Sequence, residues 1–303
     1  MVETVMAHKP ATNDGQDLRD PAYIRLREVI YQTSGIYQTD EKLYLLASRC
    51  ARRMGALHLK TPSDYLAYLT VRENREAEMR LLLNEITIGE TYMFRSPPQL
   101  EALRNVILPQ IMKAKAALGF RRLHVWSAGC STGEEPYTLA MFFLQESERL
   151  LSGWSFDILA TDLNDNSLAA ARAGIYGEYA LRTTSELLRK KYFKPLDDKH
   201  LQVGEQLKSL IRFDRVNLND DSRMTFLKGM DLIFCCNVLI YFDLASKSKV
   251  VQHFYSNLLP GGYLFLGHAE SLYQVEDRFR LVHFPGAIGY WKPPLGKVEG
   301  GKE

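Results

Sequence analysis

The hydrophobic pattern divides the chain into two regions. Up to about residue 90, apolar residues recur at helical spacing in PAYIRLREVIYQTS, DEKLYLLASRCARRMGALHL and TPSDYLAYLTVRENREAEMRLLLNEI. Thr61, Pro62 and Ser63 supply a cap and a start for the last of these segments. We therefore predict a helical domain over residues 21–90, preceded by a polar, disordered tail over residues 1–20.

The second region, residues 91–293, begins with the helical segment PPQLEALRNVILPQIMKA and then alternates short apolar runs with helices. The runs LHVWSA, FDILAT, IRFDRV, MDLIFCC and YLFLG are continuous, as in parallel strands that are covered on both faces. Helical stretches such as EEPYTLAMFFLQESERL and ASKSKVVQHFYSNLL separate several of them. This pattern predicts repeated strand–helix–strand units and an α/β fold with a doubly wound parallel sheet.

Two features interrupt or close this alternation. Within about 175–213, the segments HLQVG and LKSLIRF indicate a small antiparallel β-hairpin that is inserted before a core strand. At the end, FRLVHF and AIGYW flank Pro285-Gly286, which predicts an antiparallel hairpin that closes the sheet. We expect one α/β domain with an inserted β-subdomain.

Composition and charge exclude several classes of protein. The formal net charge of the 303 residues is only +2, which argues against a main affinity for nucleic acid or anionic lipid. No apolar run approaches the roughly 20 residues that span a bilayer, and the first twenty positions are polar, so we expect a cytoplasmic protein without membrane insertion. The four cysteines lack metal-ligand spacing, so we expect reduced thiols, no disulfide and no metal; they are Cys50, Cys130, Cys235 and Cys236.

The segment LHVWSAGCSTGEEPYTLA is the strongest local signal. Gly129 and Gly133 form a turn between a buried strand and a helix, and Pro136 suits the first helical turn. Such a turn lets the backbone approach a nucleotide closely, although a purely structural turn is the alternative. Glu134 and Glu135 would repel a pyrophosphate and favour a cationic ligand. S-adenosylmethionine, which carries a sulfonium and an ammonium, therefore fits better than NAD or ATP.

Polar residues follow three of the predicted strands. Asp162 ends FDILAT, where a carboxylate can accept both ribose hydroxyls; it could instead cap the next helix. Asn217 follows IRFDRV and Asn237 follows MDLIFCC, and either could be an ordinary turn residue. Because the carboxyl ends of parallel strands meet at one edge of the sheet, we expect a shared ligand site there.

These segments resemble the chemotaxis receptor methyltransferase family, which methylates glutamate side chains on receptor signalling helices. The resemblance covers almost the whole chain and rests on ITIGETYMFR, WSAGCSTGEEPYTLA, ATDLNDNSLAAARAGIYG, FCCNVLIYF and GGYLFLGHAES. It implies a Rossmann-like class I methyltransferase sheet, S-adenosyl-L-methionine as cofactor and S-adenosyl-L-homocysteine as product. It also implies protein-glutamate O-methyl transfer.

The resemblance implies roles for particular residues. Arg95 and Tyr241 would be catalytic, positioning a carboxylate that is already an anion at neutral pH and needs no general base. Judged without the resemblance, an ion pair of Arg95 with Glu90 or Glu101 and a core position for Tyr241 are the simpler interpretations. The implied cofactor contacts are Gly89, Thr91, Arg95, Ala128, Gly129, Gly133, Glu135, Asp162, Asn217, Leu218, Cys235, Cys236 and Asn237. Gly89 stands where many relatives have Asn, and Cys236 where many have Arg.

Partners also follow from the resemblance. Arg49, Arg52 and Arg53 lie at helical spacing and would form a basic ridge for docking acidic receptor helices, although such a run is usually only a solvated face. The inserted hairpin corresponds to the family's β-subdomain, whose edge captures a receptor tail in some members. We expect a monomer that binds no nucleic acid.

Four alternatives stay open. A nucleic-acid amino-methyltransferase would need a Pro-Pro-aromatic type of motif after Asn237, which is absent. A ring-carbon methyltransferase would need a nucleophilic cysteine, for which Cys236 is a candidate. A small-molecule methyltransferase would not need an arginine-bearing helical domain. A non-catalytic cofactor-binding module is the last alternative.

Overall fold

The computed structural model describes residues 20–294. The predicted tail therefore lies outside the described residues, except for Asp20, whose carboxylate accepts a hydrogen bond from the backbone N–H of Ala22 and so caps the first helix. The prediction that this first domain is helical is confirmed. Its elements are α1 (Pro21–Ser34), a 3₁₀ turn (Asp40–Lys42), α2 (Leu43–Ala56), α3 (Pro62–Thr70) and α4 (Arg72–Ile86).

The segment 61–86, which we expected to be one helix, is two helices. The hydroxyl of Thr61 caps α3 as predicted, accepting from the N–H of Asp64 at 3.1 Å. At Val71 the backbone is extended, with φ −71° and ψ 122°, which ends α3 and begins α4. The break folds α4 back against α3, so that Tyr65 and Met79 share one buried core. Tertiary packing here overrides a local pattern that fits a longer helix.

The second domain is built on a seven-stranded sheet in the order β6-β2-β1-β7-β8-β10-β9. The first five strands in that order are parallel, and the last two form the antiparallel hairpin that the sequence predicted. Because β1 has β2 on one side and β7 on the other, the strand order reverses at the carboxyl end of β1. The strands are β1 (Arg122–Ala128), β2 (Ser155–Asp162), β6 (Ile211–Arg215), β7 (Met230–Cys235), β8 (Leu258–Leu266), β9 (Arg280–Phe284) and β10 (Ala287–Trp291).

Two hydrophobic layers cover the sheet, which explains the continuous apolar runs. In β7, Leu232 and Phe234 point into one layer, while Ile233 and Cys235 point into the other. The first layer is formed with the run 97–116, with α7 (Glu134–Ser147) and with α8 (Asp165–Ala173); the second is formed with α13 (Leu244–Asn257) and the short α12 (Asp221–Met224). The run 97–116 consists of α5 (Pro97–Ala102), a π-helical turn (Leu103–Ile107) and α6 (Leu108–Ala116).

The inserted subdomain differs from the expected hairpin. Residues His200–Val203 form the central strand of a three-stranded antiparallel sheet in the order β3-β5-β4. The segment LKSLIRF pairs with none of it, because its first half ends α11 and its second half begins the core strand β6. These strands are short and mostly exposed, so their sequences show no alternation of apolar and polar residues that would predict them. The elements are β3 (Ile175–Gly177), α9 (Glu178–Leu181), α10 (Glu186–Tyr192), β4 (Phe193–Pro195), β5 (His200–Val203) and α11 (Glu205–Lys208).

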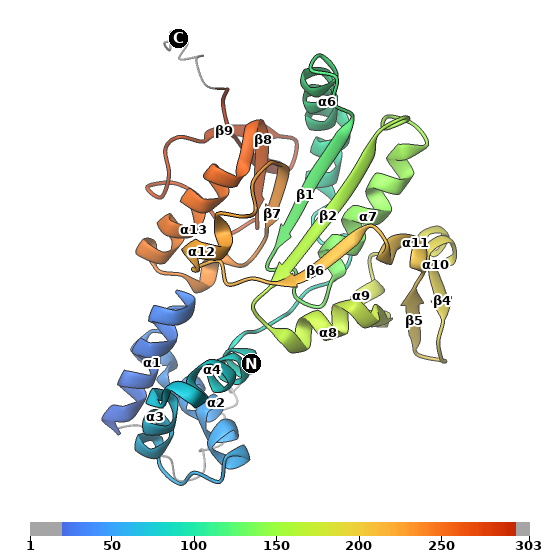
Figure 1. The fold of residues 1–303 in the computed structure, drawn as a ribbon. Coiled ribbons are helices and arrows are strands. Elements are labelled where there is room, and N and C mark those ends of the chain that lie inside the picture. The colour runs from blue at the N-terminus through green and yellow to red at the C-terminus, as the bar shows by residue number, and fades with distance from the viewer. Residues whose placement is uncertain (1–19, 295–303) are drawn as a thin grey trace, which may run out of the picture.

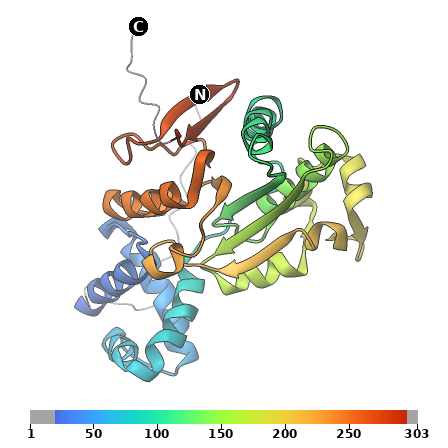
Figure 2. The same cartoon turned by 45° about the horizontal axis from the view of Figure 1, so that its top comes forward.

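The helical domain lies against the carboxyl ends of the central strands, as Figures 1 and 2 show. Tyr31 donates a hydrogen bond from its hydroxyl to Asp243 at 2.9 Å, and the N–H of Tyr37 donates to the carbonyl of Tyr241 at 2.9 Å. The two domains therefore meet at the edge of the sheet where open α/β folds bind ligands. No helix within residues 20–294 is long and apolar enough to cross a membrane.

Candidate active site

A cavity of about 460 Å³ lies between the helical domain and the carboxyl edge of the sheet. Its walls come from the loops after β1, β2, β6 and β7, from the linker over residues 87–96, and from the helical domain. The volume is in the range of small-molecule sites. The predicted site residues that line the cavity are Gly89, Thr91, Arg95, Gly129, Glu135, Asp162, Asn217, Leu218, Cys236, Asn237, Tyr241 and Arg49.

The glycine turn after β1 has the backbone that its sequence predicts. Gly129 and Gly133 have φ of +80° and +97°, a region that residues with a Cβ rarely adopt. A Cβ on Gly129 would lie 2.4 Å from Val238, so the turn can approach the loop after β7 only because this residue is glycine. Gly133 does not reach the cavity; a Cβ there would lie 2.9 Å from Ala171, and its absence lets α7 pack close to α8.

The two glutamates that begin α7 have different environments. Glu135 lines the cavity and accepts a hydrogen bond from the hydroxyl of Ser127 at 2.7 Å. Glu134 is buried away from the cavity and accepts from the hydroxyl of Thr132 at 2.7 Å. Burial raises the pKa of Glu135, and the hydrogen bond from Ser127 and the charge of Arg95 oppose this rise only in part. Of the pair expected to face a cation, only Glu135 faces the cavity.

Asp162 holds the glycine turn and its own loop together. One carboxylate oxygen accepts from the N–H of Ser131 at 2.8 Å, and the other accepts from the N–H of Asn164 at 2.8 Å. Burial raises the pKa of Asp162, and these N–H groups partly oppose that effect. The cap of α8 is Asn164 rather than Asp162, which removes the alternative interpretation of Asp162 as a helix cap.

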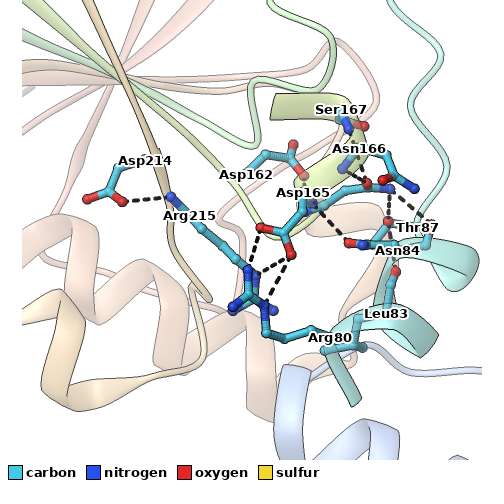
Figure 3. Close-up of polar contacts among 11 residues, drawn as sticks. Arg80, Leu83, Asn84, Thr87, Asp162, Asp165, Asn166, Ser167, Asp214 and Arg215 are labelled. Carbon is cyan, nitrogen blue, oxygen red and sulfur yellow. Dashed lines mark hydrogen bonds and ion pairs between the residues drawn. The ribbon is translucent and has the colours of Figure 1, made fainter. Parts of the chain in front are cut away.

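The helical domain fastens this loop, as Figure 3 shows. The side-chain amide of Asn164 donates to the carbonyl of Asn84 at 3.0 Å and to the hydroxyl of Thr87 at 2.8 Å. The N–H of Asp165 donates to the side chain of Asn84 at 2.9 Å, and Arg80 forms two hydrogen bonds with the carboxylate of Asp165. Hydrogen bonds and an ion pair thus hold the loop that carries Asp162 against the C-terminal part of α4.

Asn217 and Leu218, after β6, also line the cavity. The side-chain amide of Asn217 donates to the carbonyl of Thr33 at 2.6 Å, and its oxygen accepts from the N–H of Asn219 at 3.0 Å. Because both ends of the Asn217 side chain are engaged, its backbone is held at the cavity wall.

The loop after β7 is clamped by a residue that the sequence reasoning did not single out. Glu270 accepts hydrogen bonds from the backbone N–H groups of Asn237 and Gly267, both at 2.7 Å, and from that of Ile240 at 3.2 Å. Asn237 has a φ of +61°, an uncommon conformation that this clamp supports. The segment GGYLFLGHAES contained Glu270, but nothing local indicated that it reaches back to β7.

Cys235 and Cys236 are not poised as nucleophiles. Cys235 is fully buried in the core and does not line the cavity; Ala128, the last residue of β1, is buried in the same way. Burial raises the pKa of both thiols, well above their ordinary value, and neighbouring carboxylates including Glu135 reinforce the effect for Cys236. A thiol held protonated at neutral pH argues against ring-carbon methylation through Cys236.

Arg95 and Tyr241 lie at the mouth of the cavity. Arg95 is exposed and donates to the backbone carbonyl of Glu90 at 3.1 Å; Glu101 pairs with Arg104 instead, so neither expected ion pair of Arg95 is formed. Tyr241 is 36% exposed and is therefore not a core aromatic. Burial raises the pKa of Tyr241, while the nearby charge of Arg95 opposes the rise. The guanidinium of Arg95 and the hydroxyl of Tyr241 thus lie together at the mouth of the cavity.

The three arginines of α2 do not form one ridge. Arg53 is mostly buried and makes two hydrogen bonds to the buried carboxylate of Glu78, at 2.8 and 2.9 Å. Arg52 is exposed and pairs with Glu85 at 3.1 Å. Only Arg49 lines the cavity: the spacing places the three side chains near one another on the helix, but Arg52 and Arg53 turn to Glu85 and Glu78 of α4.

The sheet order, the glycine turn at its switch point and the carboxylates of Glu135 and Asp162 in the cavity together define an α/β protein that binds a nucleoside cofactor with cationic character. Residues 89–288 match the family model described as CheR methyltransferase, SAM binding domain, and residues 21–87 match CheR methyltransferase, all-alpha domain. The chain belongs to the CheR methyltransferase family.

Curated relatives agree with this assignment. Chemotaxis protein methyltransferase 2 of Vibrio cholerae serotype O1 is 33% identical over 282 residues, covering 93% of this chain and 96% of the relative. Chemotaxis protein methyltransferase of Borreliella burgdorferi is 34% identical over 248 residues, covering 82% and 87%. Chemotaxis protein methyltransferase 1 of Pseudomonas aeruginosa is 34% identical over 267 residues, covering 86% and 94%. The chain is an S-adenosylmethionine-dependent methyltransferase.

The cavity fits this cofactor in its own right. Glu135 and Asp162 supply negative charge for a cation and acceptors for hydroxyl groups. Ser131 and Gln38 also line the cavity, and each has a buried side-chain oxygen with no hydrogen-bond partner in the described part of the chain. Buried polar atoms of this kind normally have partners, which a polar ligand can provide.

Proposed function

We propose that the chain is a protein-glutamate O-methyltransferase that modifies glutamate side chains on the signalling helices of chemoreceptors, for sensory adaptation. The observation that carries the proposal is the polarity of the cavity: carboxylates lie inside it, and the cation Arg95 lies at its mouth beside the hydroxyl of Tyr241. An interior with acidic groups suits a cationic cofactor, and a basic rim suits an anionic acceptor.

The inner part of the cavity would hold the cofactor. S-adenosylmethionine, when bound, supplies an electrophilic methyl group on a sulfonium sulfur. In this proposal Asp162 binds the ribose hydroxyls, Glu135 faces the cationic part, and the backbone at Gly129 allows close approach. Further contacts come from Gly89, Thr91, Asn217, Leu218, Cys236 and Asn237, which line the same cavity.

The residues at the mouth have the simpler task of holding an anion. A glutamate carboxylate with an ordinary pKa near 4.3 is already ionised at neutral pH, so no group has to remove a proton. Arg95 would orient one carboxylate oxygen, and the Tyr241 hydroxyl would donate to it from the side. Both groups restrict rotation of the acceptor and help to exclude water, while the other carboxylate oxygen stays free to react.

Receptor docking would use Arg49 at the cavity and Arg52 on the exposed side of α2. The outer strands β3 and β4 of the small sheet each pair on one side within the described residues, so either could accept a receptor tail as an added strand. We further propose that the protein acts as a monomer in the cytoplasm.

The experiment is transfer of a radiolabelled methyl group from S-adenosylmethionine to purified receptor cytoplasmic domains, followed by mild alkali. We expect label that alkali releases as methanol and that disappears when the acceptor glutamate is replaced by alanine. Alkali-stable label, or tight cofactor binding without label, would refute glutamate methylation. Arg95→Met should lower kcat while leaving cofactor affinity within a few fold.

A further inference from the structure

The linker that carries Arg95 is attached to the small β-subdomain through its backbone. The N–H of Met93 donates to the carbonyl of Ala180 at 3.0 Å, and the hydroxyl of Thr183 donates to the carbonyl of Met93. Phe94 then adopts a φ of +54°, with its N–H bonded to the hydroxyl of Thr138 at 3.0 Å. The backbone direction into Arg95 is therefore fixed by contacts on both sides.

Side chains continue this attachment toward the mouth of the cavity. The guanidinium of Arg182 lies between two aromatic rings, 3.5 Å from the ring centre of Tyr92 and 3.9 Å from that of Tyr179. The hydroxyl of Tyr179 donates to the carboxylate of Glu90 at 2.8 Å. Arg95 in turn contacts both linker residues: it bonds to the carbonyl of Glu90 and lies 5.7 Å from the ring centre of Tyr92.

We propose that Tyr179 and Arg182 of the β-subdomain are positioning residues for methyl transfer: they hold Glu90 and Tyr92, and through them Arg95, at the mouth of the cavity. This inference rests on the proposed function, because it takes Arg95 as the group that orients the acceptor carboxylate.

The exposure of the cluster argues for this role over a purely structural one. Tyr179 is 59% exposed and Arg182 is also exposed, so neither contributes much to the hydrophobic core. Arg95 is at the surface, where an arginine side chain samples many rotamers. It can orient the acceptor carboxylate only if it is held within a fraction of an ångström of one position. The two-ring stack and the Tyr179–Glu90 hydrogen bond restrain the segment that bears Arg95.

The test compares kinetics of variants in the full chain. Arg182→Ala removes both ring contacts and should lower kcat about tenfold, with the cofactor Kd unchanged. Arg182→Lys keeps a cation at the rings and should recover part of the loss, and Tyr179→Phe should lower kcat about threefold through loss of one hydrogen bond. The matched control is Arg278→Ala, which removes a guanidinium 4.3 Å from the Tyr255 ring at the far end of the sheet.

Hydrogen–deuterium exchange of the segment 88–95 supplies a second measurement that does not depend on the acceptor. Arg182→Ala should speed exchange there, whereas Arg278→Ala should not. An unchanged kcat in Arg182→Ala, or a fall equal to that of Arg278→Ala, would overturn the inference while leaving the proposed function intact. A wild-type chain that methylates no receptor glutamate would overturn the proposed function, and this inference with it.

Discussion

Asn164→Asp is the most informative substitution at the contact between the two domains. Asn164 is 7% exposed, and its side chain has two separate tasks. Its oxygen caps α8 by accepting from the N–H groups of Asn166 and Ser167, and its amide donates to the carbonyl of Asn84 and the hydroxyl of Thr87. Aspartate retains the cap, since Asp and Asn are equally good at this position, but it cannot donate when ionised.

The expected loss follows from these contacts. Each of the two donated hydrogen bonds contributes about 1 kcal/mol, and a carboxylate facing the buried carbonyl of Asn84 adds a further cost of about 1–2 kcal/mol. We therefore expect Asn164→Asp to lower the free energy of unfolding by about 3–4 kcal/mol at pH 7. The cofactor Kd should rise as well, because Asp162 is held by the same loop.

The pH dependence gives this prediction a distinctive sign. A carboxylate at position 164 would have its pKa raised above the unfolded value near 3.9, by burial and by the facing carbonyl. Protonation restores a donor, so the deficit should be smallest below about pH 4 and should grow as pH rises through the folded pKa. Urea unfolding of the variant and the wild type between pH 4 and 8 measures this difference.

The matched control is Asn166→Asp, which adds the same charge two residues away on an exposed side chain in the first turn of α8. We expect it to change stability by less than about 0.5 kcal/mol. If Asn164→Asp were as stable as this control at pH 7, or if its deficit did not depend on pH, the amide contacts to α4 would not be stabilising the domain contact.

Further substitutions test the cofactor cavity, the arginines of α2 and the position of Gly89. Glu135→Gln should raise the Kd of S-adenosylmethionine by about tenfold or more. Burial raises the pKa of Glu135, so the affinity of the wild type, measured by calorimetry, should fall as the pH is lowered through that pKa. The variant should lose this pH dependence. Arg53→Ala leaves the buried carboxylate of Glu78 without its ion pair and should lower the free energy of unfolding by about 3 kcal/mol. Arg49→Ala, at the cavity, should leave stability unchanged and raise the KM for the receptor at low salt. Gly89→Ala places a Cβ 2.3 Å from the hydroxyl oxygen of Ser131 and should weaken cofactor binding in a fluorescence titration. Adding Ser131→Ala relieves the clash and should bring the affinity back to that of Ser131→Ala alone; no recovery would contradict a steric cause.

The elements that the sequence predicted well are those whose own residues, without knowledge of distant partners, indicate their structure. The strands β1, β2, β7 and β8 are largely continuous apolar runs because both of their faces are covered, whereas the edge strand β6 alternates apolar and charged residues. The turn at Gly129 needs a positive φ that glycine supplies. The loops after the strands could be assigned to one site because parallel strands bring their carboxyl ends together, whereas the linker residues Gly89, Thr91 and Arg95 were assigned from the family resemblance. Twelve of the predicted positions line the cavity.

The remaining features depend on contacts between distant parts of the chain. The break at Val71 follows from packing of α3 against α4, and the pairing of the short strand His200–Val203 follows from its neighbours rather than from its own pattern. Arg53 faces Glu78 rather than solvent, and Glu270 reaches back to the loop after β7. Spacing on one helix or one strand contains no information about such partners.

The clamp made by Glu270 also bears on how the protein is made. The cavity needs Tyr37 and Arg49 from the early part of the chain, but the loop that carries Asn237 and Tyr241 is held by a carboxylate that is synthesised much later. During translation, the loop after β7 cannot gain these hydrogen bonds, and the binding cavity cannot be completed, until residue 270 has left the ribosome. Nascent chains short of that point should leave cellular S-adenosylmethionine unbound, and premature termination before β8 should yield fragments that do not compete with the finished enzyme for its cofactor.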